Sequence, residues 1–227
     1  MFFDVGETLV HPHPTVPDLF AKILRGEGHD VTPDMVRERM HVVFDRFRSA
    51  AQTNELWTTS TERSRRFWQD VYEIFLRELG VPNADGLIDV VYGEFTDLSN
   101  YRLFDDVPAV LDRLREAGVV LGVVSNFEAW LEGLLDELGV THYFSVRVIS
   151  GVEGMEKPDP RIFELAMSRA GVAPDASVYV GDNPEFDVDP ALALGMFPVL
   201  IDRRRRFLDA PGTRIDSMAE LPSVLGL

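Results

Sequence analysis

Four short polar segments, each following an apolar run, carry the side chains best suited to chemistry. They contribute Asp4, the pair Ser125 and Asn126, Lys157, and Asp182. If the apolar runs are strands of one parallel sheet, these side chains meet at the edge formed by the carboxyl ends of the strands, where open α/β sheets bind ligands. Carboxylates with a cation between them suit Mg²⁺, a hard ion that takes oxygen ligands and pairs with phosphate.

The elements that must position these side chains alternate between apolar runs and helical patterns. Strands are predicted at 1–5, 119–124, 146–149, 178–180 and 197–201. Between them, apolar residues recur at the spacing of one helix face, as in 107–114 and 130–138. This alternation predicts βαβ units, and therefore a Rossmann-like, three-layer α/β fold whose parallel sheet is covered by helices on both faces.

A long stretch between the first strand and the rest of the sheet is helical almost throughout. Apolar stripes at helical spacing run through 36–47 and 67–75, and Pro33 and Pro82 stand near expected helix starts. We therefore expect an α-helical domain at 14–100, inserted into an α/β core domain formed by 1–13 and 101–227.

Composition narrows the function classes. The chain has no cysteine, which excludes disulfides, thiolate catalysis and cysteine metal sites. A formal net charge of −16 argues against nucleic acid or anionic membrane as a partner, because both require basic surface. No apolar run approaches the roughly 20 residues of a membrane helix and no secretory signal is visible, so we expect a cytoplasmic protein. The two lysines among 22 basic residues are Lys22 and Lys157, which makes Lys157 notable.

In this order, the four polar segments resemble the four motifs of the haloacid dehalogenase superfamily. The resemblance covers essentially the whole chain, and the helical insert resembles the C1-type cap of that superfamily. Asp4 matches the nucleophile of the Asp-x-Asp-Gly-Thr motif, and Ser125 matches the hydroxyl that binds the transferring phosphoryl group. Lys157 matches the lysine that neutralises the nucleophile and the phosphoryl charge. Asp182 matches an acidic metal ligand, with Asp187 as its supporting carboxylate.

The resemblance implies a Mg²⁺-dependent phosphatase that acts on a small phosphorylated metabolite through an aspartyl-phosphate, as a monomer or homodimer. The ion is expected on Asp4, the backbone carbonyl of Gly6, and Asp182. Asn126 is expected to join Ser125 and Lys157 in substrate binding or to orient that group, and Thr8 to support the first loop. The wording Val-Val-Ser-Asn-Phe, and later Glu-Lys-Pro-Asp-Pro-Arg-Ile-Phe, is similar to the branch called haloacid dehalogenase-like hydrolase domain-containing protein 3.

The sequence departs from the motif at Gly6, where phosphatases of the superfamily carry a second aspartate that serves as general acid and base. Three readings follow. The chain is a slow or unusual phosphatase, with Glu7 or His11 standing in for that group. Alternatively it is a 2-haloacid dehalogenase, whose nucleophile motif also lacks the second aspartate, although Gly181-Asp182 keeps the metal-binding form. The third possibility is a catalytically quiet relative that binds a phosphorylated ligand or a partner protein. The presence of Asp4, Lys157 and Asp182 together argues against this possibility.

Several of these residues also have plain structural interpretations. Ser125-Asn126 and Asp187 are residue types that begin helices. A metal role for His11 and His13 is disfavoured, because prolines separate them and no third imidazole is near. The charge run 203–206 is interpreted as a solvated loop. Trp57 is assigned to the core, and the surface is the expected place for Arg63, Arg65 and Arg66.

Overall fold

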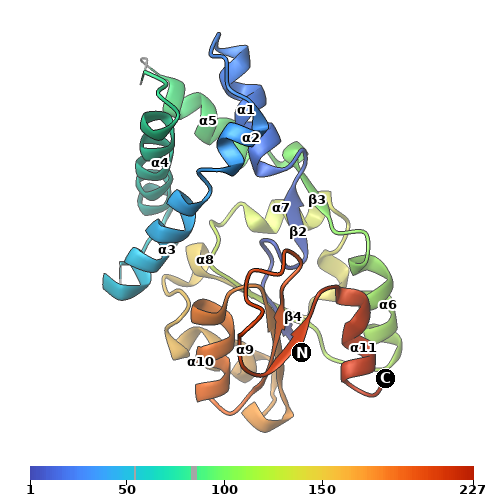
Figure 1. The fold of residues 1–227 in the computed structure, drawn as a ribbon. Helices are drawn as coiled ribbons and strands as arrows, with labels where there is room; N and C mark the ends of the chain where they lie inside the picture. Colours follow the sequence, from blue (N-terminus) through green and yellow to red (C-terminus); the bar gives the residue numbers. More distant parts are fainter. Residues whose placement is uncertain (54, 83–85) are drawn as a thin grey trace. The chain divides into compact units, whose positions relative to one another are not determined.

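The computed structural model describes residues 1–53, 55–82 and 86–227, which form two compact units (Figure 1). One unit consists of Met1–His11 and Leu103–Leu227, and the other of Pro12–Arg102. Within the described ranges, no helix combines the length and apolarity needed to cross a membrane. The role of the predicted insert 14–100 as a cap stays a prediction.

A parallel sheet of six strands forms the centre of the first unit, in the order β5-β4-β1-β6-β7-β8. The strands are β1 (Phe2–Phe3), β4 (Gly122–Ser125), β5 (Val146–Ile149), β6 (Val178–Gly181), β7 (Phe197–Ile201) and β8 (Thr213–Ile215). The predicted parallel α/β fold is therefore confirmed. Apolar side chains fill both sides of the inner strands, as expected for a sheet covered on two faces.

The order of strands reverses at β1, which creates the crevice where such sheets bind ligands. After β1 the chain builds β4 and β5 on one side, and it later returns to place β6 on the other. In this register Phe3 lies between Val123 and Val180, and the amide of Asp4 donates to the carbonyl oxygen of Val180 at 2.8 Å. Asp4 thus leaves the sheet at the switch point itself.

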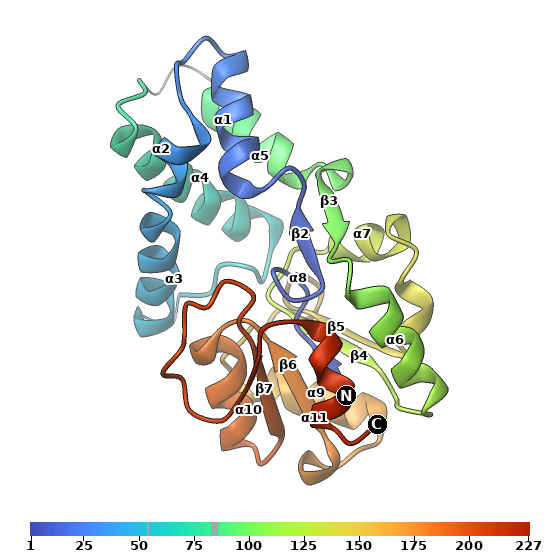
Figure 2. The same cartoon turned by 45° about the vertical axis from the view of Figure 1, so that its right-hand side comes forward.

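Helices cover the two faces of this sheet (Figures 1 and 2). On one face lie α9 (Pro160–Ala170) and α10 (Asp189–Ala193), which share an apolar cluster with the strands. The other face carries α6 (Val107–Glu116) and α11 (Leu221–Val224), and α7 (Leu131–Glu137) and α8 (Ser150–Glu153) follow β4 and β5. The boundaries of α9 follow from its sequence, since Asp159 caps its first turn and Gly171, at φ 66°, ends it.

The second unit is built from helices around its own apolar core. Its elements are α1 (Val16–Gly26), α2 (Pro33–Arg37), α3 (His41–Thr53), α4 (Thr61–Glu78), α5 (Leu87–Thr96) and a 3₁₀ turn at Leu98–Asn100. The hydroxyls of Thr32 and Ser60 cap α2 and α4. A two-stranded sheet of β2 (Val10–Pro12) and β3 (Tyr101–Leu103) forms where the chain leaves the first unit and returns to it.

Three predicted elements differ in extent from the observed ones. The first strand is limited to Phe2–Phe3, because the carbonyl oxygen of Val5 already accepts turn hydrogen bonds. Residues 119–121 precede β4, since the amide of Val119 closes the end of α6 instead. The apolar stripe at 36–47 is divided between α2 and α3 by a turn at 38–40. Pro33 begins α2 as predicted, whereas Pro82 borders residues outside the described ranges.

The end of β6 tolerates no side chain at Gly181. A Cβ atom there would overlap the carboxyl group of Asp187, whereas a Cβ atom at Gly6 would meet only the Phe127 ring, at 3.9 Å. We predict that Gly181→Ala destabilises the protein by at least about 1–3 kcal/mol, the usual cost of overpacking, because Asp187 must move. Gly6→Ala serves as the control from the same unit. Urea unfolding of the two variants measures the difference, and equal midpoints would contradict the prediction.

Candidate active site

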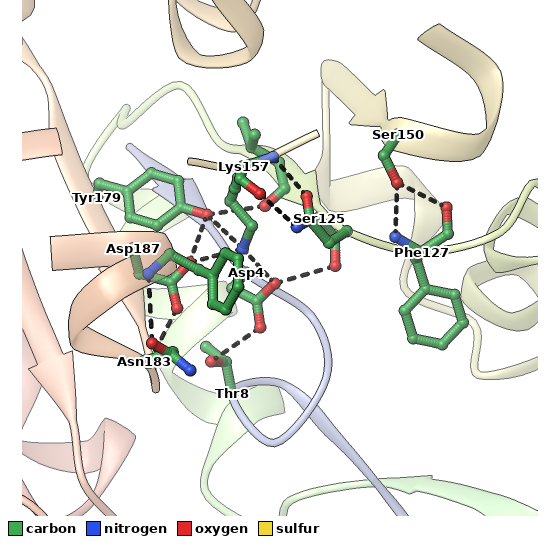
Figure 3. Close-up of polar contacts among 12 residues, drawn as sticks. Asp4, Thr8, Ser125, Phe127, Ser150, Lys157, Tyr179, Asn183 and Asp187 are labelled. Atoms are coloured by element: carbon green, nitrogen blue, oxygen red, sulfur yellow. Dashed lines mark hydrogen bonds and ion pairs between the residues drawn. The ribbon is translucent and has the colours of Figure 1, made fainter. Parts of the chain in front are cut away.

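A buried lysine lies at the centre of the candidate site (Figure 3). The Nζ atom of Lys157 donates to Oδ1 of Asp187 at 2.6 Å, to Oδ1 of Asp4 at 2.8 Å and to the hydroxyl oxygen of Tyr179 at 3.1 Å. The lysine side chain is 3% exposed. Residues far apart in the sequence therefore converge on one ammonium group.

The charges of this cluster decide its protonation. Burial by itself lowers the pKa of Lys157, but the carboxylates of Asp187 and Asp4 outweigh burial and hold that pKa well above its usual value. Burial also raises the pKa of Tyr179 well above its usual value, so its hydroxyl stays protonated and donates to the carbonyl oxygen of Val124 at 2.8 Å. The site thus holds a permanent ammonium ion beside Asp4.

The carboxylate of Asp4 is oriented from several directions. Its Oδ1 atom accepts hydrogen bonds from Lys157 and from the hydroxyl of Ser125, at 3.0 Å for Ser125. Its Oδ2 atom accepts a longer bond, 3.4 Å, from the buried hydroxyl of Thr8. Ser125 stands at the end of β4, next to β1, and therefore does not begin a helix. With one oxygen held firmly, Oδ2 is the more available nucleophile.

The loops that follow β4 and β5 are fastened to each other. The Asn126 amide accepts from the backbone N–H of Lys157 at 2.7 Å and donates to its carbonyl oxygen at 2.8 Å. The Ser150 hydroxyl accepts from the Phe127 amide and donates to the Phe127 carbonyl oxygen (Figure 3). Asn126, predicted to bind substrate or to orient the group, therefore positions the backbone of Lys157.

Three aspartates form a candidate metal centre. Asp4, Asp182 and Asp187 each offer a carboxylate oxygen within 4.8 Å of the others. Burial raises the pKa of Asp182 to about 8, helped by the charges of Asp4 and Asp187, although a fifth of its side chain stays exposed. Such crowding of hard oxygen donors suits a divalent cation of the Mg²⁺ type, whose charge relieves the repulsion.

Asp187 supports this centre rather than starting a helix. It lies in a π-helical turn, Pro184–Val188, and precedes Val188, which is the N-cap residue of α10. Its Oδ2 atom accepts the backbone N–H of Asn183 at 3.0 Å, and its Oδ1 atom accepts from Lys157. Both carboxylate oxygens are thereby fixed at the end of β6.

The charge run 203–206 is not simply a solvated loop, and that interpretation is wrong for its first and last members. Arg203 is 14% exposed, pairs with Asp106 at 2.8 Å and covers the Phe104 ring at 3.8 Å. Arg206 is 26% exposed and its Nη2 atom lies 2.9 Å from Oδ2 of Asp182. The carboxylates of Asp106 and Asp182 thus hold the guanidinium groups of Arg203 and Arg206 partly out of solvent.

The first loop has an unusual conformation at Glu7, whose φ of +57° lies in the left-handed region. Its carboxylate is paired with Arg204 at 2.7 Å. The ring of His11 packs against Phe104 at 4.5 Å. Both residues considered as substitutes for the missing acid at Gly6 are therefore engaged elsewhere, which argues against that role.

The other sequence candidates have contacts of their own within the described residues. Neither His11 nor His13 belongs to the acidic cluster found in the described residues. Trp57 is buried in an aromatic group of the helical unit, as assigned. The surface arginines pair locally, Arg65 with Asp89 and Arg66 with Glu62. Sequence reasoning missed Tyr179 and Arg206, for which the only signals were a phenol inside a strand and a place in the basic run 203–206.

Comparisons with known proteins agree with this geometry. Residues 1–195 match the family model of haloacid dehalogenase-like hydrolases. The chain is 32% identical over 207 residues to mouse haloacid dehalogenase-like hydrolase domain-containing protein 3, covering 88% of this chain and 80% of that protein. It is 34% identical over 240 residues to a glyceraldehyde 3-phosphate phosphatase of Methanothermobacter thermautotrophicus, covering 99% and 98%.

The fold comparison points the same way. The crystal structure of the HAD-hydrolase YfnB from Bacillus subtilis, bound to magnesium, superposes with a TM-score of 0.81 at 17% identity. The alignment covers all of this chain and 97% of that one. Sequence and fold together place the protein: the chain belongs to the haloacid dehalogenase-like hydrolase family.

Proposed function

We propose that this hydrolase is a Mg²⁺-dependent phosphatase that cleaves a small phosphate monoester through an aspartyl-phosphate on Asp4. The observation that carries the proposal is the carboxylate of Asp4, held by buried Lys157 and Ser125 beside the acidic cluster. Relatives named as phosphatases add support. Attack by a carboxylate on a phosphate ester requires this combination of a fixed carboxylate and a fixed positive charge.

In the first step, Oδ2 of Asp4 attacks the phosphorus atom in line, and the bond from phosphorus to the ester oxygen breaks. Lys157 and the Ser125 hydroxyl offset negative charge on the phosphoryl oxygens as it develops. The departing alkoxide takes a proton from water, because Gly6 offers no carboxyl group. In the second step, a water molecule attacks the phosphorus atom and the bond from phosphorus to Oδ2 of Asp4 breaks, which restores the Asp4 carboxylate. Orthophosphate leaves with one proton of that water, and the other proton neutralises the hydroxide left by the first step.

A divalent cation fits the donor set of this site. Asp4 and Asp182 would hold it, with the Gly6 carbonyl as a further oxygen ligand and Asp187 as support. When bound, it supplies Lewis-acid stabilisation of the phosphoryl charge. We assign the helical unit, predicted as a cap, the selection of the substrate. The substrate is proposed only as a class, a small phosphorylated metabolite.

The two other readings are less well supported. A 2-haloacid dehalogenase needs no metal ion, so the cluster of Asp4, Asp182 and Asp187 would be an unexplained electrostatic cost. A catalytically quiet binding protein gives no reason for the hydroxyl of Ser125 and the ammonium group of Lys157 to converge on the same oxygen of Asp4. Both alternatives predict results different from ours in the first experiment below.

The central test uses a small aryl phosphate with and without Mg²⁺. We expect Mg²⁺-dependent release of orthophosphate by the wild-type protein. Asp4→Asn should abolish it, because an amide is not a nucleophile toward phosphorus. Malachite-green detection of orthophosphate gives the rate. Metal-independent release of chloride from 2-chloropropionate, without phosphate release, would contradict the proposal and support the dehalogenase.

A second prediction concerns the missing acid. The space at Gly6 accommodates a side chain, since an added Cβ meets only the Phe127 ring, at 3.9 Å. We expect Gly6→Asp to accelerate hydrolysis of an alkyl phosphate by up to ~10²–10⁴, the usual value of a general acid. The gain for an aryl phosphate should be smaller, because its leaving group needs no proton. Gly6→Asn is the isosteric control, and equal gains for both variants would refute the acid–base explanation.

The third prediction concerns pH. A cation binds the ionised form of Asp182, whose pKa is about 8 in the metal-free protein, so binding must release a proton below that pH. The apparent affinity for Mg²⁺ should therefore rise as the pH increases from 6 to about 8 and level off above it. Calorimetry in buffers of different ionisation enthalpy measures both affinity and proton release. An affinity independent of pH over this range would show that Asp182 does not bind the ion.

A further inference from the structure

Arg206 lies on the carboxylate that the proposed cation requires. Its Nη2 atom is 2.9 Å from Oδ2 of Asp182, and about a quarter of the arginine side chain is exposed. The contact joins the loop after β7 to the residue that follows β6, so both partners belong to the same compact unit. The basic run therefore reaches the candidate metal centre directly.

The backbone that carries Arg206 is well fastened. The buried carboxylate of Asp202 accepts the amide of Arg206 at 2.8 Å and the amide of Phe207 at 2.9 Å. Asp202 is itself paired with Arg214 at 3.3 Å. The backbone of the loop is thus held by Asp202, while the guanidinium group of Arg206 contacts Asp182 and lies 5.2 Å from the centre of the Phe207 ring.

The charges around Asp182 explain the contact. When the three clustered carboxylates are all ionised, they face one buried ammonium group, Lys157, so two negative charges remain to be neutralised. Arg206 supplies a positive charge at Asp182 in the metal-free protein. A divalent cation on Asp182 would be repelled by a guanidinium in the same place and would compete for the same carboxylate. Even if the cation used the other carboxylate oxygen of Asp182, the two positive charges would repel each other, so the cation and Arg206 each weaken the binding of the other.

We propose that Arg206 is an exchangeable counter-ion, which holds Asp182 in the metal-free protein, yields it to the divalent cation and then binds the anionic phosphate of the substrate. This inference rests on the proposed function, because it takes Asp182 as a cation ligand. Arginine suits the exchange, since its planar fork of N–H donors matches a carboxylate and a phosphate equally well.

The neighbouring arginines provide the comparison. Arg205 has the same charge one residue away, but it is 71% exposed and pairs with Asp216 at 2.7 Å. Arg205→Gln therefore removes one positive charge from the same loop without touching the cluster. Any effect of Arg206→Gln beyond that of Arg205→Gln is due to the contact with Asp182 and not to net charge.

The first measurement is calorimetric titration of the metal-free protein with Mg²⁺ at about pH 9, where Asp182 is ionised because its pKa is about 8. We expect Arg206→Gln to bind Mg²⁺ about tenfold more tightly than Arg205→Gln, because the competing charge next to Asp182 is gone. Arg206→Lys keeps that charge and should remain near the wild type. Far-ultraviolet circular dichroism confirms that each variant is folded. Equal Mg²⁺ affinities of the Arg206→Gln and Arg205→Gln variants would overturn the proposal.

The second measurement is titration of the Mg²⁺-saturated proteins with orthophosphate. Arg206→Gln should bind it about tenfold more weakly than Arg205→Gln, because a charge-assisted hydrogen bond is lost. Opposite shifts in cation and anion affinity are the signature of exchange, since a damaged site would weaken both. Unchanged orthophosphate affinity would overturn the transfer to substrate. If the wild type binds no Mg²⁺ at all, the proposed function fails instead, so the two failures are distinguishable.

Discussion

The ammonium group of Lys157, buried between the carboxylates of Asp4 and Asp187, is the interaction on which the other contacts of the site depend. Burying any of these charges alone is costly, and each becomes tolerable only because the others are present. The hydroxyl oxygen of Tyr179 accepts the third hydrogen bond that the ammonium group of Lys157 donates. Removing the lysine would leave buried carboxylates repelling one another, so site and fold are coupled through this side chain.

The sheet topology explains how so few residues bring these charges together. β1 is short, yet it lies at the centre of the sheet with β4 on one side and β6 on the other. The residues just beyond these strands, Asp4, Ser125 and Asp182, are therefore neighbours by register and need no long loops. The lysine comes from a longer connection, and the amide of Asn126 fixes its backbone. The positions of the site residues thus follow from the pairing of the strands and from the hydrogen bonds between the Asn126 amide and the backbone of Lys157.

The parts of this arrangement that sequence could predict are those governed by local patterns. β5 and β7 match their predicted limits because each strand places three apolar residues in the buried interior of the sheet. The start of β4 was misplaced because Val119 is apolar for another reason, the closing of α6. Asp4, Lys157, Asp182 and Asp187 were predicted as site residues from the order of their motifs along the chain, and the structure brings these four side chains together.

What escaped prediction depends on contacts between distant residues. Tyr179 looked like an ordinary strand residue, since nothing local shows that its hydroxyl reaches Lys157. Arg206 looked like surface charge, because its partner Asp182 lies 24 residues away. The division of the stripe at 36–47 into α2 and α3 was also invisible, because apolar spacing continues across the turn. The spacing of apolar residues indicates which face of a helix is buried, but it does not indicate where the backbone hydrogen bonds of the helix stop.

The first loop shows how departures from a motif can compensate for one another. The left-handed residue of the loop is Glu7, at φ +57°, which is the position where the superfamily motif has glycine. A side chain there costs roughly 1 kcal/mol, and the glycine at position 6 does not relieve it, because Gly6 does not adopt a positive φ. The ion pair between Glu7 and Arg204 supplies a local attraction that a glycine would lack. Compared with the superfamily motif, the chain therefore lacks a carboxyl group at position 6 and carries one at position 7 that ties the loop to the basic run. The two departures have a common structural consequence: the first loop has no proton donor at position 6 but is anchored through Glu7, and the arginine loop that receives this anchor is the same one that reaches Asp182.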